Sequence, residues 1–247
     1  MVSIQNQIVM ISGGSKGIGF AAARRLGQAG AKISLCARGA DSLQAAAEEL
    51  QKQKIEVFPF QADVANEKDV EQWFAETENH FGPASILIPN AGISGYGDLK
   101  DLTEEQFDQT IRVNLRGVFL CCQRAIPRMI EAQTGKIIIL SSIASKYFRH
   151  GHALYFASKW ALNGFAFSMA KELNEHNIHV HLICPGMVDT NFFDAAGGRP
   201  HPPDHEYLEP ELIADMAEQL IRLPDTVDTL DWAVYPHWQQ HNLGVRR

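Results

Sequence analysis

The chain alternates between short apolar runs and longer stretches with helical periodicity. The apolar runs occupy residues 8–12, 32–36, 57–61, 85–88, 136–140, 179–184 and 230–235. The longer stretches occupy residues 18–29, 41–53, 67–81, 103–131, 157–176 and 210–223. Strands that alternate with helices are typical of βαβ units and of a parallel sheet covered on both faces. We therefore expect an α/β protein with a doubly wound parallel sheet of about seven strands.

One long segment, residues 187–209, departs from this alternation. It contains Gly197, Gly198 and three prolines. A loop longer than about 15 residues in a compact domain is usually functional or mobile. We predict a single domain over residues 1–247 whose loop at 187–209 covers a substrate site as a lid. A surface insertion without a role is the alternative.

Composition narrows the classes of partner. The formal net charge is −7 and the sequence pI is about 5.8, whereas general nucleic-acid binders carry a basic surface. No apolar stretch reaches the roughly 18 residues of a membrane span, and the N-terminus lacks the basic region of a signal peptide. The four cysteines show no CxxC spacing and predict buried thiols in the cytoplasm. The histidines lack the acidic or thiol neighbours of a metal site, so no metal is expected.

A glycine-rich turn follows the first apolar run. Gly13, Gly17 and Gly19 lie between that predicted strand and the first predicted helix. Glycines there allow the backbone to approach a phosphate, and the helix N-terminus offers free N–H groups. This placement predicts a dinucleotide site, although a purely structural turn is the alternative.

The residues after the second run indicate which dinucleotide is bound. The run is followed by Ala37 and Arg38, with no acidic residue before Asp41, and Lys16 adds a cation within the glycine turn. An acidic residue at this strand end accepts from the ribose of NAD, whereas an arginine accommodates the 2′-phosphate of NADP. We therefore predict NADP(H), with ordinary surface cations as the alternative.

Tyr155 and Lys159 are four residues apart, so on a helix they share one face. A free tyrosine has a pKa of about 10 and is a poor base near neutral pH. A neighbouring ammonium group would lower that pKa. The hydroxyl of Ser142, if it lies near this pair, could hold a carbonyl or alcohol oxygen. The trio predicts a site for proton transfer.

Taken together, these motifs resemble the short-chain dehydrogenase/reductase family over nearly the whole chain. Residues 12–19 match its T-G-x-x-x-G-x-G turn, with serine in place of threonine, and Ser142, Tyr155 and Lys159 match its catalytic serine and Y-x-x-x-K. Residues 89–92 match N-N-A-G except for Pro89, which removes a backbone donor at a strand end and puts the local pairing after that strand in question. The remaining matches are an adenine-contacting pair, a helix asparagine and a P-G-x-x-x-T segment: Asp63, Val64, Asn114, Pro185, Gly186 and Thr190.

The resemblance implies a Rossmann-like fold and hydride transfer between NADP(H) and a small carbonyl or alcohol substrate. It implies that Tyr155 donates the proton, Lys159 lowers its pKa and binds the nicotinamide ribose, Ser142 holds the substrate oxygen, and Asn114 holds a water that connects Lys159 to solvent. It also implies a homodimer or homotetramer built on the helices of Asn114 and Tyr155. The cofactor set it implies is Gly13, Ser15, Lys16, Gly17, Ile18, Gly19, Arg38, Asp63, Val64, Asn90, Ala91, Gly92, Tyr155, Lys159, Pro185, Gly186, Val188 and Thr190.

The substrate itself is less well determined. We expect substrate contacts from Ser94, Gly95, Tyr96, Ala144, Ser145, Tyr147, Phe148, His152, Met187 and the loop up to Tyr207. The C-terminal residues lack the V-D-G-G segment of 3-oxoacyl-[acyl-carrier-protein] reductases, which favours a broad carbonyl/alcohol oxidoreductase. A 3-oxoacyl reductase, with Arg124, Arg128 and Lys171 facing an acidic carrier, is the first alternative. A catalytically silent NADP(H) sensor or scaffold is the second.

Overall fold

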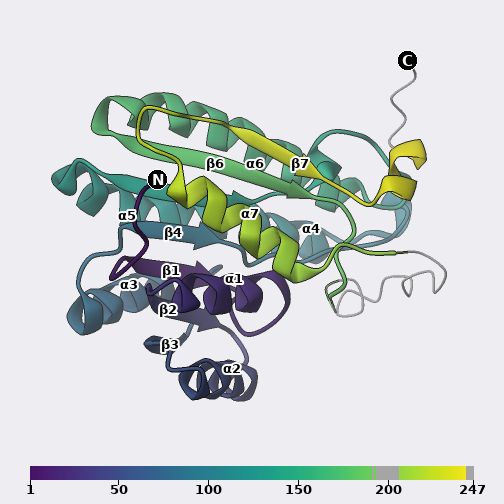
Figure 1. Ribbon diagram of the computed structural model, residues 1–247. Helices are drawn as coiled ribbons and strands as arrows, with labels where there is room; N and C mark the ends of the chain where they lie inside the picture. Colours follow the sequence, from purple (N-terminus) through teal and green to yellow (C-terminus); the bar gives the residue numbers. More distant parts are fainter. Residues whose placement is uncertain (191, 193–205, 243–247) are drawn as a thin grey trace.

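The computed structural model describes residues 1–190, 192 and 206–242. In the described part of the chain, seven parallel strands form one sheet in the order β3-β2-β1-β4-β5-β6-β7 (Figure 1). The predicted doubly wound parallel sheet is confirmed. The strands are β1 (Ile8–Ser12), β2 (Lys32–Ala37), β3 (Val57–Gln61), β4 (Ile86–Pro89), β5 (Gly135–Leu140), β6 (Ile178–Pro185) and β7 (Asp231–Val234).

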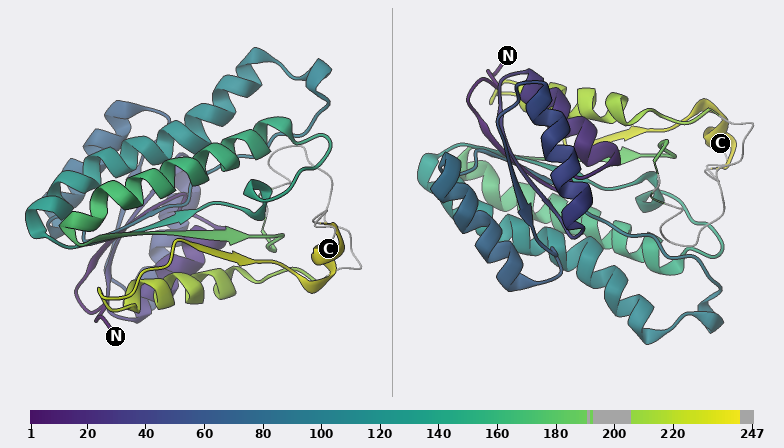
Figure 2. Two further views of the ribbon diagram at one scale, coloured as in Figure 1. Left: turned by 90° about the horizontal axis from the view of Figure 1, so that it is seen from above. Right: turned by 90° about the horizontal axis from the view of Figure 1, so that it is seen from below.

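Helices cover both faces of the sheet (Figure 2). Helices α1, α2 and α7 pack on one face, and α3, α5 and α6 pack on the other. The α-helices are α1 (Gly17–Gln28), α2 (Ala40–Lys52), α3 (Glu67–Phe81), α4 (Glu104–Ile111), α5 (Gly117–Ala132), α6 (Ala153–Leu173) and α7 (Pro210–Arg222). Shorter helical turns are η1 (Leu99–Asp101), the π-helix η2 (Arg112–Arg116), η3 (Ile143–Ser145), η4 (Asn174–His176) and η6 (His237–Asn242).

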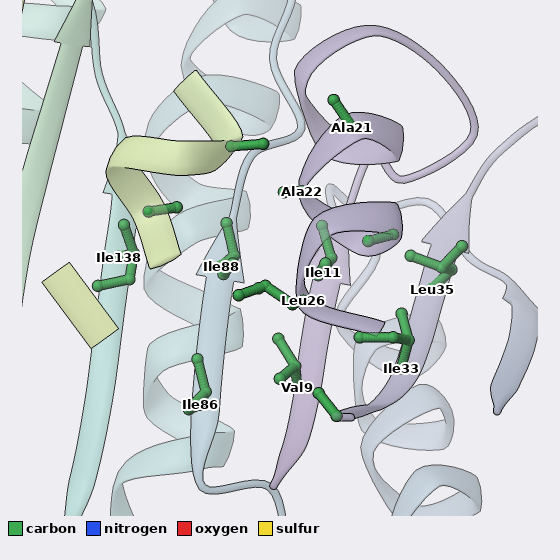
Figure 3. Close-up of a cluster of buried hydrophobic side chains, with 14 of the residues drawn as sticks. Val9, Ile11, Ala21, Ala22, Leu26, Ile33, Leu35, Ile86, Ile88 and Ile138 are labelled. Atoms are coloured by element: carbon green, nitrogen blue, oxygen red, sulfur yellow. The ribbon is translucent and has the colours of Figure 1, made fainter. Parts of the chain in front are cut away.

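The core is built from β-branched strand residues against small helix residues. On the α1 face, Val9, Ile11 and Ile88 meet Ala22 and Leu26 (Figure 3). Alanines on α1 bring the helix close to the sheet, and the branched residues fill the pleated surface. This packing holds the start of α1 directly after the end of β1.

Two helices differ from the predicted boundaries. The predicted helix at 103–131 is interrupted by the π-turn η2, which joins α4 to α5. Helix α6 begins at Ala153 instead of residue 157. Its N-cap residue, His152, makes no side-chain capping bond, so the sequence carries no capping signal for this start. The earlier start places Tyr155 in the first turn of α6.

Because all the strands run in one direction, their carboxyl ends lie along one edge of the sheet. The strand order reverses between β1 and β4. The helix that follows β1 covers one face of the sheet, and helix α5, after β4, covers the other. Ligands of open parallel sheets bind at such a point, outside the carboxyl ends of the strands. Among the described residues, no helix combines the length and apolar character needed to cross a bilayer.

Candidate active site

A cleft of about 700 Å³ runs along the carboxyl edge of the sheet. The turns after β1, β2, β3, β4, β5 and β6 all contribute to its walls. All of the predicted cofactor residues except Gly19, together with Ser142, line this one cleft. Gly19 is buried, and a Cβ on it would collide with the carbonyl oxygen of Gly13, so it allows close packing within the turn.

The glycine turn exposes backbone to the cleft. Gly13 and Gly17 have φ values of +65° and +56°, in the left-handed region that favours glycine. A Cβ on Gly13 would lie 2.9 Å from Ala91 Cα. Helix α1 begins at Gly17 without a side-chain cap, so its first N–H groups remain available to an anion. The turn therefore fits the phosphates of a dinucleotide.

Two cations lie at the end of the cleft next to β2. Lys16 and Arg38 are both exposed, and in the part of the chain that the structure describes neither forms an ion pair. Arg24, which also lines this end, is instead paired with Glu211. No carboxylate neutralises Lys16 and Arg38 there among the described residues, so this end fits a 2′-phosphate better than a free ribose hydroxyl.

Ser12 connects the turns after β1 and β4. Its hydroxyl accepts hydrogen bonds from the backbone N–H groups of Asn90 (3.0 Å) and Ala91 (3.1 Å). The Asn90 side chain donates to the carbonyls of Ser12 and Gly13 at 3.0 and 3.1 Å. The ladder between β1 and β4 ends at Pro89, which lies opposite Ser12, so the pairing after that strand, which the proline put in question, is made by the Ser12 hydroxyl instead. The Ser12 hydroxyl provides acceptors beyond the point where the ladder ends.

Tyr155 and Lys159 occupy successive turns of α6, as the i,i+4 spacing predicts. The Lys159 ammonium lies 5.8 Å from the centre of the Tyr155 ring and donates to the carbonyl of Leu140 at 3.0 Å. Ser142 follows β5 and forms a hydrogen bond with the Tyr155 phenol that acts to lower its pKa. Its hydroxyl also accepts from the N–H of Ala144 at 3.0 Å. The three predicted side chains are therefore neighbours.

Burial dominates the ionisation of this pair. Burial raises the pKa of Tyr155 to about 12, against the smaller lowering effect of the Ser142 hydrogen bond. Burial lowers the pKa of Lys159 to about 8. The pKa of Tyr155 therefore lies above its usual value, because loss of hydration outweighs the Ser142 hydrogen bond, and the lowering of this pKa by Lys159 stays a prediction. The phenol stays protonated near neutral pH, the form that donates a proton.

Asn114 lies in the π-turn η2, and its side chain is committed to protein groups. Its Oδ1 accepts from the N–H of Ile93 at 2.8 Å, and its Nδ2 donates to the carbonyl of Ile93 and to Ser158 Oγ at 2.9 and 3.0 Å. Ser158 Oγ in turn donates to the carbonyl of Tyr155 at 2.7 Å. Asn114 thus ties the loop after β4 to α6. Its predicted contact with a water stays a prediction.

A buried polar network that sequence reasoning missed holds the Ser142 turn. Ser141 Oγ donates to Asn163 Oδ1 at 2.6 Å, and Asn163 Nδ2 donates to Ser145 Oγ at 2.9 Å. Ser145 Oγ donates to the Ser142 carbonyl at 2.7 Å. Ser145 is therefore a buried network member, not the predicted substrate contact. Asn163, inside the apolar helix α6, was the sequence signal for this network, because a buried asparagine needs hydrogen-bond partners.

Aromatic side chains surround Tyr155 on the predicted substrate side. Tyr147 and Phe192 pack against a small cluster that contains Tyr155 and Phe156. The Tyr147 and Phe156 rings meet edge to face at 5.2 Å. Phe148 instead points to solvent, 84% exposed, and stacks on Trp160. Much of the predicted lid, residues 191 and 193–205, lies outside the described residues.

The base of that loop is described on both sides. Val188 and Leu208 form a parallel bridge, and the Leu208 N–H donates to the Met187 carbonyl at 3.0 Å. Trp238 Nε1 donates to the carbonyl of Glu206 at 2.6 Å. The chain therefore returns to the cleft before α7 begins.

The histidines of β6 lie away from this cleft. His179 and His181 stack at 6.2 Å on one sheet face, as their alternation predicts. His179 lies 3.9 Å from Asp225 and 3.8 Å from Asp228. Among the described residues there is no group of three or more side chains arranged to hold a metal ion.

Comparison with known proteins agrees with this geometry. Residues 7–198 match the model of a family described as short chain dehydrogenase. The 3-oxoacyl-[acyl-carrier-protein] reductase MabA of Mycobacterium tuberculosis is 33% identical over 191 residues, 77% of this chain and 73% of its own. An alcohol dehydrogenase from the archaeon Thermococcus sibiricus, complexed with 5-hydroxy-NADP, is 30% identical with a TM-score of 0.87, covering 95% of this chain and 98% of its own. A variant of actinorhodin polyketide ketoreductase with NADPH is 27% identical with a TM-score of 0.87, and the match covers both chains fully.

Proposed function

We propose that this chain, which belongs to the short chain dehydrogenase family, is an NADP(H)-dependent oxidoreductase. It interconverts a small carbonyl compound and its alcohol. The observation that carries this proposal is the convergence of Ser142, Tyr155 and Lys159 on the cleft that contains the uncapped glycine turn. The solved relatives complexed with 5-hydroxy-NADP and NADPH support the choice of cofactor. Lys16 and Arg38, which are exposed and form no ion pair with any residue that the structure describes, support it from this chain's own residues.

NADPH, when bound, supplies the hydride for the carbonyl carbon. The glycine turn and the first N–H groups of α1 would hold its phosphates, and Lys16 and Arg38 would hold the 2′-phosphate. Asp63 and Val64 would contact the adenine. Seven further residues of the set, besides Tyr155 and Lys159, would hold the nicotinamide half: Asn90, Ala91, Gly92, Pro185, Gly186, Val188 and Thr190.

Ser142 and Tyr155 act on the substrate oxygen. The Ser142 hydroxyl orients it, and the Tyr155 phenol donates its proton as negative charge develops there. Because burial raises the pKa of Tyr155 to about 12, the phenol is protonated at neutral pH. Lys159, one turn along α6, stabilises the phenolate left behind. General acid catalysis of this kind typically contributes about 10²–10⁴-fold.

The 3-oxoacyl-[acyl-carrier-protein] reductase remains a second candidate because of the similarity to MabA. Two of the three predicted docking cations weaken it. Arg124 lies 3.5 Å from Glu67, and Arg128 lies 2.8 Å from both Glu78 and Glu131. Cations that are already paired offer little net attraction to an acidic carrier, so we favour small carbonyl substrates.

The chain also carries features for self-association and for a reducing compartment. The exposed face of α6 has no charged residue from Ala157 to Ser168, and it presents Trp160 (45% exposed) and Phe167 (37% exposed). An apolar stripe of this kind supports a homodimer or homotetramer. All four cysteines are buried free thiols, which supports the proposed cytoplasmic location.

The test is NADPH oxidation with a panel of ketones, aldehydes and a 3-oxoacyl thioester. We expect turnover of several small carbonyl compounds, and a Tyr155→Phe variant that binds NADPH normally but loses at least about 10²-fold in kcat. Selective turnover of the thioester would favour the second candidate. Tight NADPH binding with no turnover of any compound would support a silent sensor or scaffold instead.

A further inference from the structure

The segment after β7 returns to the active site, where Gln239 is buried. Residues 235–239 lead from the edge of the sheet to the base of the 187–209 loop (Figure 1). Gln239 is only 5% exposed. A glutamine that loses its hydration needs partners for both ends of its amide.

One end of that amide holds the backbone beside the nicotinamide segment. Gln239 Oε1 accepts from the N–H of Met187 at 3.0 Å. The preceding residue, Gly186, donates its own N–H to the Val234 carbonyl at 2.7 Å. A Cβ on Gly186 would collide with Gln239 Oε1 and lie 2.6 Å from Tyr235 Cβ. The glycine thus makes room for Gln239.

The other end of the amide reaches the substrate side. Because Oε1 is used by Met187, the amide nitrogen donates to the Tyr147 phenol, a bond that opposes the burial-driven rise in the pKa of Tyr147. Tyr147 packs against the cluster that contains Tyr155. Gln239 therefore bridges the Met187 backbone and the aromatic wall beside the proton donor.

Neighbouring contacts hold the segment in place. The Gln239 N–H donates to the Pro236 carbonyl at 2.9 Å. Trp238 donates to Glu206 at 2.6 Å, and its ring meets Tyr207 edge to face at 6.1 Å. Gln239 thus enters the site from a segment that is itself anchored to the base of the loop.

We propose that Gln239 is a positioning residue that sets the width of the substrate site by fixing Tyr147 relative to the Met187 backbone. The role rests on the proposed carbonyl reductase function. Gln239 touches neither the reacting atoms nor the hydride path in this scheme. Its effect on catalysis passes through Tyr147, which packs against the cluster that contains Tyr155.

The test combines a double-mutant cycle with hydrogen exchange. Gln239→Met keeps the length of the side chain and removes both hydrogen bonds, and Tyr147→Phe removes one of them. We expect Gln239→Met to raise KM for carbonyl substrates about fivefold to tenfold, the scale of one hydrogen bond, with a smaller change in kcat. Tyr147→Phe should raise KM similarly, and the double variant should be no worse than Gln239→Met alone. Gln51→Met, on the exposed surface of α2, is the matched control and should leave KM unchanged.

Exchange of the Met187 amide hydrogen reads the contact without any turnover. It should become about tenfold faster in Gln239→Met and stay unchanged in Tyr147→Phe. Unchanged Met187 exchange, or additive effects on KM, would overturn the proposal. If the unmutated protein reduces no carbonyl compound, the proposed function fails. The exchange experiment needs no turnover, so it would still report whether Gln239 holds the Met187 backbone.

Discussion

At the scale of single residues, burial sets the chemistry of the candidate site. Tyr155 and Lys159 are both buried. Burial raises the pKa of Tyr155 and lowers the pKa of Lys159, so both shifts favour the uncharged form. The spacing of the pair is visible in the sequence. The direction of the tyrosine shift is not, because it depends on how completely distant groups such as Cys184 and Phe192 cover the phenol.

The lowered pKa of Lys159 predicts a pH dependence for carbonyl reduction. Tyr155, with a pKa of about 12, remains protonated through pH 10, so it should not limit the reaction there. Lys159 loses its charge as the pH rises through about 8. We therefore expect kcat/KM for reduction to be level below pH 8 and to fall above it.

The variant Lys159→Met should lose most activity and also the break near pH 8. Lys171→Met, on the exposed end of the same helix, is the control and should keep both the rate and the break. If the break at pH 8 persisted in Lys159→Met, the titrating group would have to be another residue.

Reversal of charge at Arg38 tests the cofactor preference. Arg38→Asp removes a cation from the 2′-phosphate end and places a carboxylate there, so NADPH should bind at least about tenfold more weakly. NADH affinity should change little or improve. Fluorescence titration of both cofactors measures this, with Lys52→Asp on α2 as the control. Equal affinity of the unmutated protein for NADPH and NADH would contradict the predicted preference.

At the scale of elements, the π-turn η2 and helix α6 cooperate. An ordinary α-helix over 103–131 was expected, and the extra residue per turn in η2 instead turns Asn114 toward Ile93. Asn114 then meets Ser158 on α6, which is fully buried. The two elements together fix the loop after β4 relative to Tyr155.

Removal of the Ser158 hydroxyl should loosen this junction. Ser158→Ala leaves Asn114 Nδ2 without its acceptor on α6, so we expect the free energy of unfolding to fall by about 1–2 kcal/mol. Turnover should fall as well, since Tyr155 shares that turn of the helix. Denaturant unfolding and steady-state kinetics measure the two effects. Ser168→Ala, at an exposed position on the same helix, is the control and should change neither the stability nor the turnover. A Ser158→Ala variant as stable as the unmutated protein would show that the junction does not depend on this bond.

At the scale of the whole molecule, the exposed face of α6 is unusual for a surface that meets water. Phe119 on α5 lies next to it, with its ring 6.4 Å from Phe165. Phe148 and Trp160 add a stacked pair. These apolar side chains extend the same stripe across two helices, which fits a surface used between subunits.

Gly164 offers a selective test of that association. A Cβ at Gly164 would meet nothing within 4 Å, so a larger side chain fits the single subunit. Gly164→Arg should therefore fold normally but shift the protein from an oligomer to a monomer, as measured by light scattering. Gly164→Ala is the control and should keep the oligomer with slightly higher stability. An unmutated protein that is a monomer at micromolar concentration would refute the proposed assembly.

The sequence was sufficient for the features that depend on local spacing. The alternation of apolar runs predicted the parallel sheet, the i,i+4 spacing placed Tyr155 and Lys159 together, and the glycines marked the turn after β1. Strand ends of a parallel sheet share one edge, so the residues that follow the strands meet in one cleft.

Tertiary structure alone decided what depends on burial and on contacts between distant segments. The raised pKa of Tyr155, the commitment of the Asn114 side chain, and the arrival of Gln239 beside Met187 all follow from groups far apart in the chain. No periodicity encodes such contacts, because each depends on how completely neighbouring elements exclude water from a particular atom. The local pattern therefore specifies the reacting groups, and the packed fold specifies how they ionise and what holds them in place.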